Sequence, residues 1–178
     1  PVKITASGLP GGKTTIAGDI SSQFLSALLM IAPYAQSEIG ITLSTDLNSK
    51  PYVDMTVAIM QDFGVQVERK GYESFKIPIT NYQLRYTQHA TRNTYPIESD
   101  ASSAAYFFAA SAICGGTVKV ENISRKSKQG DIAFLDLLQQ MGCTVTETDN
   151  PSTSLRTGCI QVTGTTELRG IDVDMRDI

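Results

Sequence analysis

The sequence has 178 residues, of which 41% are hydrophobic and 19% are charged, a composition typical of a folded globular protein rather than a disordered or fibrous chain. Its 15 basic and 18 acidic residues give a net charge of -3, without the basic excess typical of nucleic-acid-binding surfaces. The longest apolar stretch, residues 24–35, is interrupted by Ser26 and Pro33 and is too short to cross a bilayer. We therefore expect no nucleic-acid partner and no membrane partner.

The three cysteines are Cys114, Cys143 and Cys159, an odd number without the CxxC spacing of metal sites. We expect three buried, unreactive thiols in a reducing, cytoplasmic environment, and no disulfide framework. The sequence begins with Pro1 instead of Met, and we expect further sequence on both sides of it.

An internal repeat organises the sequence, because two stretches about 80 residues apart show the same order of patterns. Landmarks such as Ser21 and Ser102, or Pro51 and Asp131, recur at this spacing. Hydrophobic periodicity in the first stretch predicts, in chain order, a strand at 14–17, a helix at 20–30, a strand at 39–43, a helix at 51–63, and strands at 65–67 and 75–77 around a hairpin at 70–71.

The second stretch repeats this order. It opens at 94–97 and continues with a helix from Ala101 to Gly115, a strand at 117–120, a helix capped at 130–131 that runs to Gly142, and strands at 144–146 and 159–162. Each stretch is therefore predicted to form a β-α-β-α-β-β unit. The polar segment 81–93, which includes His89, is the predicted linker, and we assign this histidine no role.

Residues 170–175 have the pattern of the first strand of a third unit. In this segment Asp172 and Asp174 alternate with apolar residues, which fits either a pair of carboxylates for acid–base chemistry or an ordinary half-exposed strand.

The start of the first predicted helix combines polar side chains with backbone donors. Ser21, Ser22 and Gln23 precede a segment that is apolar nearly all round, as in helices that are fully buried. The unpaired N–H groups and positive dipole end of a helix start suit a phosphate or a carboxylate. Ordinary N-capping by Ser21 or Ser22 is the alternative, although it explains one hydroxyl and not three successive polar side chains.

A second polar turn, residues 48–52, also leads into a helix start, with Pro51 in the favoured first turn. Ser49 would add a hydroxyl to the same anion site if the two turns converge. The alternative is a solvated loop in which Ser49 is a cap and Tyr52 is the first core contact. The residues alone therefore indicate an anion-binding α/β repeat protein.

Four segments resemble the 5-enolpyruvylshikimate-3-phosphate synthase (EPSP synthase) family. They are GDISSQFLSALLMIAP at 18–33, SKPYVDMT at 49–56, ESDASSAAYF at 98–107 and QGDIAF at 129–134. They occur in the order found in that family, and the resemblance extends to IDVDM at 171–175. Among enolpyruvyl transferases, the combination of Ser-Ser-Gln with Ser-Lys-Pro-Tyr is specific to this family.

The resemblance implies an α/β (α+β) fold, the inside-out barrel of the enolpyruvyl transferases, with helices buried inside each of two domains. The sequence would hold two β-α-β-α-β-β units and the first strand of a third. Residues 1–94 would form the last unit of the N-terminal, shikimate 3-phosphate-binding domain. Residues 95–178 would begin the C-terminal domain, with a crossover near 95–99.

The activity implied by the resemblance is transfer of the enolpyruvyl group from phosphoenolpyruvate to the 5-hydroxyl of shikimate 3-phosphate, with release of phosphate. It implies no metal and no organic cofactor, and a monomeric full enzyme. Ser21, Ser22 and Ser49 would bind the phosphate of shikimate 3-phosphate, Tyr52 would lie against its ring, and Gln23 would contact both substrates, including the position of phosphoenolpyruvate or glyphosate. Ser102 and Ser103 would only cap their helix.

The sequence also departs from the family pattern. The family's catalytic aspartate follows an Ile-Pro pair beyond the segment that resembles 172–175, so we expect no catalytic residue among these 178 and no turnover by them alone. Two alternatives remain at this stage. They are a non-catalytic phosphate-binding repeat module and the related transferase that uses UDP-N-acetylglucosamine.

Overall fold

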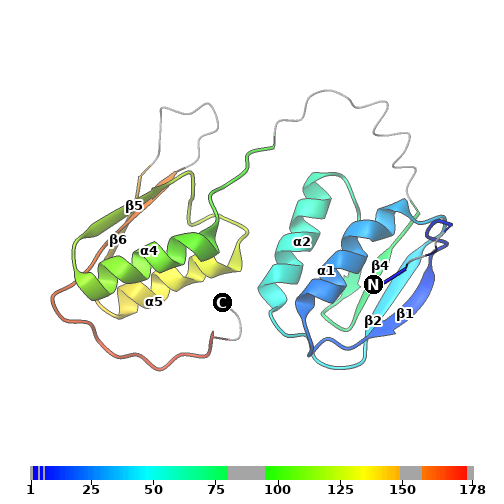
Figure 1. Cartoon of the computed structure of the whole chain (residues 1–178), viewed down its shortest axis with the longest axis horizontal. Helices are drawn as coiled ribbons and strands as arrows, with labels where there is room; N and C mark the ends of the chain where they lie inside the picture. The colour runs from blue at the N-terminus through cyan, green and yellow to red at the C-terminus, as the bar shows by residue number, and fades with distance from the viewer. Residues whose placement is uncertain (1, 4, 6, 80–94, 149–157, 176–178) are drawn as a thin grey trace. The chain divides into compact units, whose positions relative to one another are not determined.

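The computed structural model describes residues 2–3, 5, 7–79, 95–148 and 158–175. The predicted linker at 81–93, with His89, lies outside the described residues. The chain divides into two compact units, Pro1–Asn93 and Thr94–Ile178. Their elements are labelled in Figure 1. Within the described residues, none of the helices combines the length and the apolar character needed to cross a membrane.

Unit 1 combines a mixed sheet with two helices. Its elements are β1 (Gly12–Ile16), α1 (Ser22–Ile31), the 3-10 turn η1 (Ala32–Tyr34), β2 (Ile39–Leu43), α2 (Lys50–Asp62), β3 (Glu68–Lys70) and β4 (Ser74–Ile77). The strand order is β1-β2-β4-β3, with β1 parallel to β2 and the other neighbours antiparallel. The predicted β-α-β-α-β-β order is therefore present in this unit.

The core of unit 1 lies between the sheet and the two helices, which cover the same face of the sheet (Figure 1). Leu29 of α1 and Val53 of α2 are fully buried. Phe75 and Ile77 of β4 lie on the same side of their strand and are also buried, as the two-residue period of a strand requires. This core holds both helices against the sheet.

Unit 2 has the same arrangement, except that its described residues contain no strand before α4. Its elements are α4 (Ala101–Cys114), β5 (Thr117–Glu121), the 3-10 turn η2 (Gly130–Ala133), α5 (Phe134–Gln140), β6 (Thr144–Thr148) and β7 (Cys159–Thr163). The strand order is β5-β7-β6, and both pairs are antiparallel. This sheet corresponds to β2-β4-β3 of unit 1.

Three strand predictions were wrong. Residues 65–67 form no strand in the described structure, and β3 lies at 68–70 instead, because the turn bond from the Glu73 N–H to the Lys70 carbonyl places paired residues directly beside the turn. The second unit was predicted to open with a strand at 94–97, of which residue 94 lies outside the described residues. Residues 95–97 and 170–175 are also outside any strand of the described structure. A strand needs a neighbour for its backbone bonds, and these described segments pair with none.

Two burial predictions were also wrong. The first predicted helix, α1, is not buried all round, because Phe24 is 57% exposed and Met30 is 55% exposed. Cys143 and Cys159 are buried as predicted, whereas Cys114 is exposed at the C-terminal end of α4. The apolar character of these residues therefore did not predict which of them are buried in the described structure.

Candidate functional site

The two predicted polar turns lie at the same edge of the unit 1 sheet. Strands β1 and β2 are parallel, and Ile16 is paired with Leu43 at their carboxyl ends. The chain leaves these ends through residues 17–21, which lead into α1, and residues 44–49, which lead into α2. Adjacent parallel strands therefore bring the two helix starts together, the usual place for a ligand in such sheets.

A cavity of about 540 Å³ opens between these helix starts. It is lined by Ile20, Ser21, Ser22, Gln23, Ser26, Asn48, Ser49, Tyr52, Met55 and Thr56. All five side chains predicted from the sequence (Ser21, Ser22, Gln23, Ser49 and Tyr52) thus line one cavity, although the two groups are about 30 residues apart.

Ser21 is the N-cap of α1, and its hydroxyl oxygen accepts a hydrogen bond from the Gln23 N–H over 3.2 Å. The capping interpretation therefore holds for Ser21. Ser22 is the first residue of the helix and is only 6% exposed. Among the described residues, the first turn of α1 contains no acidic side chain, so its positive dipole end is not neutralised from within that turn.

Ser49 precedes α2 in a left-handed backbone conformation, with φ 54° and ψ 50°. Such a conformation is uncommon and strained for a residue with a Cβ, and it often marks a functional position. In the described structure the Ser49 hydroxyl makes no capping bond to α2. The alternative interpretation, in which Ser49 is a cap, is therefore correct for its position before α2, but the helix does not use its hydroxyl.

The walls of the cavity contain two polar residues that the sequence analysis did not select. The hydroxyls of Ser26 on α1 and Thr56 on α2 lie 3.0 Å apart, and the Thr56 hydroxyl also donates to the Tyr52 carbonyl over 2.8 Å. Ser26 lies four residues after Ser22, and Thr56 lies four residues after Tyr52. Residues four apart share one face of a helix, so helical periodicity could have predicted that both line the cavity.

The cavity is polar but carries no positive side chain among the described residues that line it. Lys50, the basic residue of the second turn, has its ammonium group 5.4 Å from the centre of the Tyr72 ring. An anion in this cavity would therefore contact hydroxyls, the Gln23 amide and the N-terminal ends of α1 and α2.

Unit 2 has a different helix start at the equivalent place. Asp100 is the N-cap of α4, and its carboxylate accepts bonds from the Ser102 N–H (3.0 Å) and the Ser103 hydroxyl (2.7 Å). The prediction that Ser102 or Ser103 caps this helix was wrong. The Ser103 hydroxyl and the backbone N–H groups lower the pKa of Asp100, so a fixed negative charge already occupies the positive end of α4.

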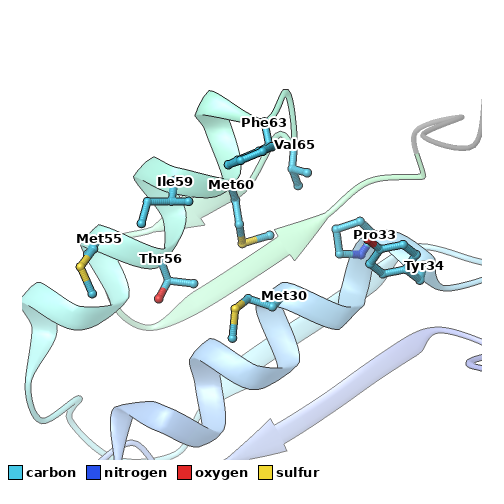
Figure 2. A pocket seen from close by; sticks show the side chains of 9 residues that line it. All are labelled: Met30, Pro33, Tyr34, Met55, Thr56, Ile59, Met60, Phe63 and Val65. Atoms are coloured by element: carbon cyan, nitrogen blue, oxygen red, sulfur yellow. The ribbon is translucent and has the colours of Figure 1, made fainter. Parts of the chain in front are cut away.

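A second cavity in unit 1, of about 420 Å³, is almost wholly apolar. Figure 2 shows that its lining side chains come from α1, α2 and the segments that follow these two helices. Phe63 is 54% exposed, whereas the residues of α2 that enter the core are Val53, Val57 and Met60. On α2, Met55, Ile59 and Phe63 therefore line the apolar cavity, whereas Tyr52 and Met55 line the polar one.

The described side chains contain no cluster of three or more His, Cys, Asp or Glu residues that could hold a metal ion. The geometry of the polar cavity instead offers hydroxyl and backbone donors, the groups that bind a phosphate or a carboxylate.

Comparison with known proteins identifies the family. The model of the EPSP synthase (3-phosphoshikimate 1-carboxyvinyltransferase) family matches residues 1–178. The chain belongs to the EPSP synthase family. This match favours EPSP synthase over the related transferase that uses UDP-N-acetylglucosamine.

Individual members of the EPSP synthase family agree with this assignment. The 3-phosphoshikimate 1-carboxyvinyltransferase of Shewanella halifaxensis is 42% identical over the whole chain, and that of a Sulfurovum species is 50% identical over 82% of the chain. A solved EPSP synthase from Acinetobacter baumannii has the same fold, with a TM-score of 0.55 and 22% identity over 92% of the chain. The chain spans 38% of the length of the Shewanella relative and 34% of the Acinetobacter chain.

Proposed function

We propose that this chain is part of an EPSP synthase and that unit 1 supplies its binding site for the phosphate of shikimate 3-phosphate. The complete enzyme adds the 5-hydroxyl of shikimate 3-phosphate to phosphoenolpyruvate, and the resulting tetrahedral intermediate eliminates inorganic phosphate. The observation that carries this proposal is the single cavity lined by Ser21, Ser22, Gln23, Ser49 and Tyr52 in a chain of this family.

Each side chain has a role that suits its position. The hydroxyls of Ser21, Ser22 and Ser49 bind the phosphate together with backbone N–H groups at the start of α1. Tyr52 packs against the shikimate ring, and Gln23 contacts shikimate 3-phosphate as well as phosphoenolpyruvate or glyphosate. This chemistry needs no metal or organic cofactor. We assign no catalytic residue to the described chain.

The organisation of the complete enzyme belongs to the same proposal. Residues 1–94 would be the last unit of the shikimate 3-phosphate-binding domain, and residues 95–178 would begin the second domain after a crossover near 95–99. We expect the complete enzyme to be monomeric and cytoplasmic.

A phosphorus NMR titration tests the proposed phosphate site. We expect the phosphorus resonance of shikimate 3-phosphate to shift as the 178-residue chain is added, with weak affinity because no described cation lines the cavity. Ser22→Ala should weaken this binding about tenfold, as expected when a hydrogen bond to a charged group is lost. Ser102→Ala changes a serine in the first turn of α4, the equivalent helix of unit 2, and serves as the control. Equal weakening by both substitutions, or by neither, would contradict the proposal.

A further inference from the structure

One threonine ties together the two loops that carry the proposed phosphate site. The Thr45 hydroxyl oxygen accepts hydrogen bonds from the N–H groups of Gly18 (2.9 Å) and Asp19 (3.2 Å). The same hydroxyl donates its proton to the Asp19 carboxylate over 2.8 Å. Thr45 lies in the loop before α2, whereas Gly18 and Asp19 lie in the loop before α1.

Asn48, which also lies in the loop before α2, makes two further bonds to the loop before α1. The side-chain amide of Asn48 donates to the Asp19 carbonyl over 2.6 Å, and its backbone N–H donates to the Gly18 carbonyl over 3.1 Å. The two loops also approach closely, because a Cβ on Gly18 would lie 2.8 Å from the Thr45 carbonyl oxygen. Only glycine fits there without moving one of the loops.

These contacts lie beside the proposed ligand groups in the sequence. Asp19 is two residues before Ser21, and Asn48 immediately precedes Ser49. Among the described residues that line the polar cavity, Asn48 is present, whereas Thr45 and Asp19 are not. Thr45 and Asp19 therefore hold the loops from outside the cavity.

We propose that Thr45 is a positioning residue that sets the distance between the Ser21–Ser22 hydroxyls and the Ser49 hydroxyl through its bonds to Gly18 and Asp19. This inference rests on the proposed function, because it concerns the same phosphate site. Holding both loops before the ligand arrives lowers the cost of ordering them on binding. Loss of the Thr45 hydroxyl would leave every ligand group present but less well placed.

The test compares Thr45→Val, which removes the hydroxyl, with Thr45→Ser, which keeps it. In the free protein, amide hydrogen exchange at Gly18 and Asp19 should accelerate in Thr45→Val and return to the wild-type rate in Thr45→Ser. The affinity for shikimate 3-phosphate should fall about tenfold in Thr45→Val and recover in Thr45→Ser, since preorganisation of this kind contributes to binding.

Two further variants keep the result interpretable. Thr117→Val removes the hydroxyl that forms a hydrogen bond with the Thr163 hydroxyl (3.0 Å) in unit 2. It should change neither the exchange at Gly18 and Asp19 nor the affinity for shikimate 3-phosphate. Asp19→Ala leaves Thr45 in place and removes one of the three bonds of its hydroxyl, the one that this hydroxyl donates. If Thr45→Val does not fold, faster exchange at Gly18 together with weaker binding in Asp19→Ala supports the role of Thr45, and wild-type values of both overturn it.

The outcomes separate the two proposals. Unchanged exchange at Gly18 and Asp19, or wild-type affinity in Thr45→Val, overturns the role of Thr45 and leaves the phosphate site standing. Absence of shikimate 3-phosphate binding by the folded wild-type protein overturns the proposed function, and with it the positioning role in binding. The exchange rates in the free protein still decide whether Thr45 holds the loops.

Discussion

Individual residues give the proposed site its chemistry, and Ser49 is the most unusual of them. Its backbone is left-handed, while its hydroxyl does not cap α2 in the described structure. The sequence analysis selected Ser49 from a polar turn before a helix, which predicts a place in the chain but not a dihedral angle. A left-handed serine depends on the surrounding loop, which a local pattern does not contain.

Substitution of Ser49 separates backbone strain from ligand binding. Ser49→Gly should raise the free energy of unfolding of unit 1 by about 0.5–1 kcal/mol, because glycine adopts a left-handed backbone without a Cβ clash. The same substitution removes the hydroxyl and should weaken the binding of shikimate 3-phosphate. Urea unfolding and a ligand titration measure the two effects. A variant that is less stable yet binds normally would contradict both assignments.

Asp100 gives unit 2 a stability that depends on pH. The pKa of Asp100 lies below its ordinary value of 3.8, chiefly because the Ser103 hydroxyl donates to the carboxylate. A lowered pKa in the folded state means that the charged cap stabilises unit 2 above pH 3.8 and that this contribution disappears as the pH falls through and below this value.

The matched variant is Asp100→Asn, which keeps a capping oxygen but cannot ionise. Wild-type protein should unfold at a higher temperature than this variant at about pH 6, and the difference should shrink toward about pH 3. Thermal unfolding followed through amide signals of α4 measures this difference. A gap that stays constant over this range would show that the charge of Asp100 contributes nothing.

At the scale of whole elements, periodicity predicted helices well and strand edges less well. The predicted helices correspond to α1, α2 and α4, and the fourth begins as a 3-10 turn and continues as α5. Helical bonds lie within one segment, so local sequence determines them. Strands depend on partners, which explains why β3 was predicted three residues too early and why residues 170–175 form no strand in the described structure.

The site was predictable to the extent that its parts lie at helix starts. Ser21, Ser22 and Gln23 were found from their polar contrast with an apolar helix. Their convergence with Ser49 depends on the parallel pairing of β1 and β2, which is a long-range contact. The sequence pattern did not single out Thr45, because its proposed role depends on bonds to residues 26 and 27 positions away.

Helix α1 provides a direct test of which apolar residues form the core of unit 1. Leu29 is fully buried, whereas Phe24 is 57% exposed. Leu29→Ala should lower the free energy of unfolding by about 2–5 kcal/mol, because it leaves a cavity in a packed core. Phe24→Ala should change it by only about 0.5 kcal/mol, as is usual for exposed positions. Urea unfolding of both variants measures this, and equal losses would contradict the assignment of the buried face.

For the whole molecule, the repeated unit explains both the likeness and the difference between the two halves. Strands β2, β4 and β3 correspond in order to β5, β7 and β6, so one architecture is used twice. The helix starts then diverge, because α1 has a neutral serine cap and α4 has a carboxylate cap. This predicts that anions bind to unit 1 and not to the equivalent place in unit 2.

The most direct test of this account is a titration of the 178-residue chain with shikimate 3-phosphate, followed by the amide signals of the protein, with shikimate as the control that lacks the phosphate. We predict saturable shifts at residues 20–24 and 49–52 with shikimate 3-phosphate, no such shifts with shikimate, and none at residues 100–104 of unit 2. A folded sample whose signals at 20–24 and 49–52 do not respond, or that respond equally to shikimate, would contradict a phosphate site at the paired helix starts.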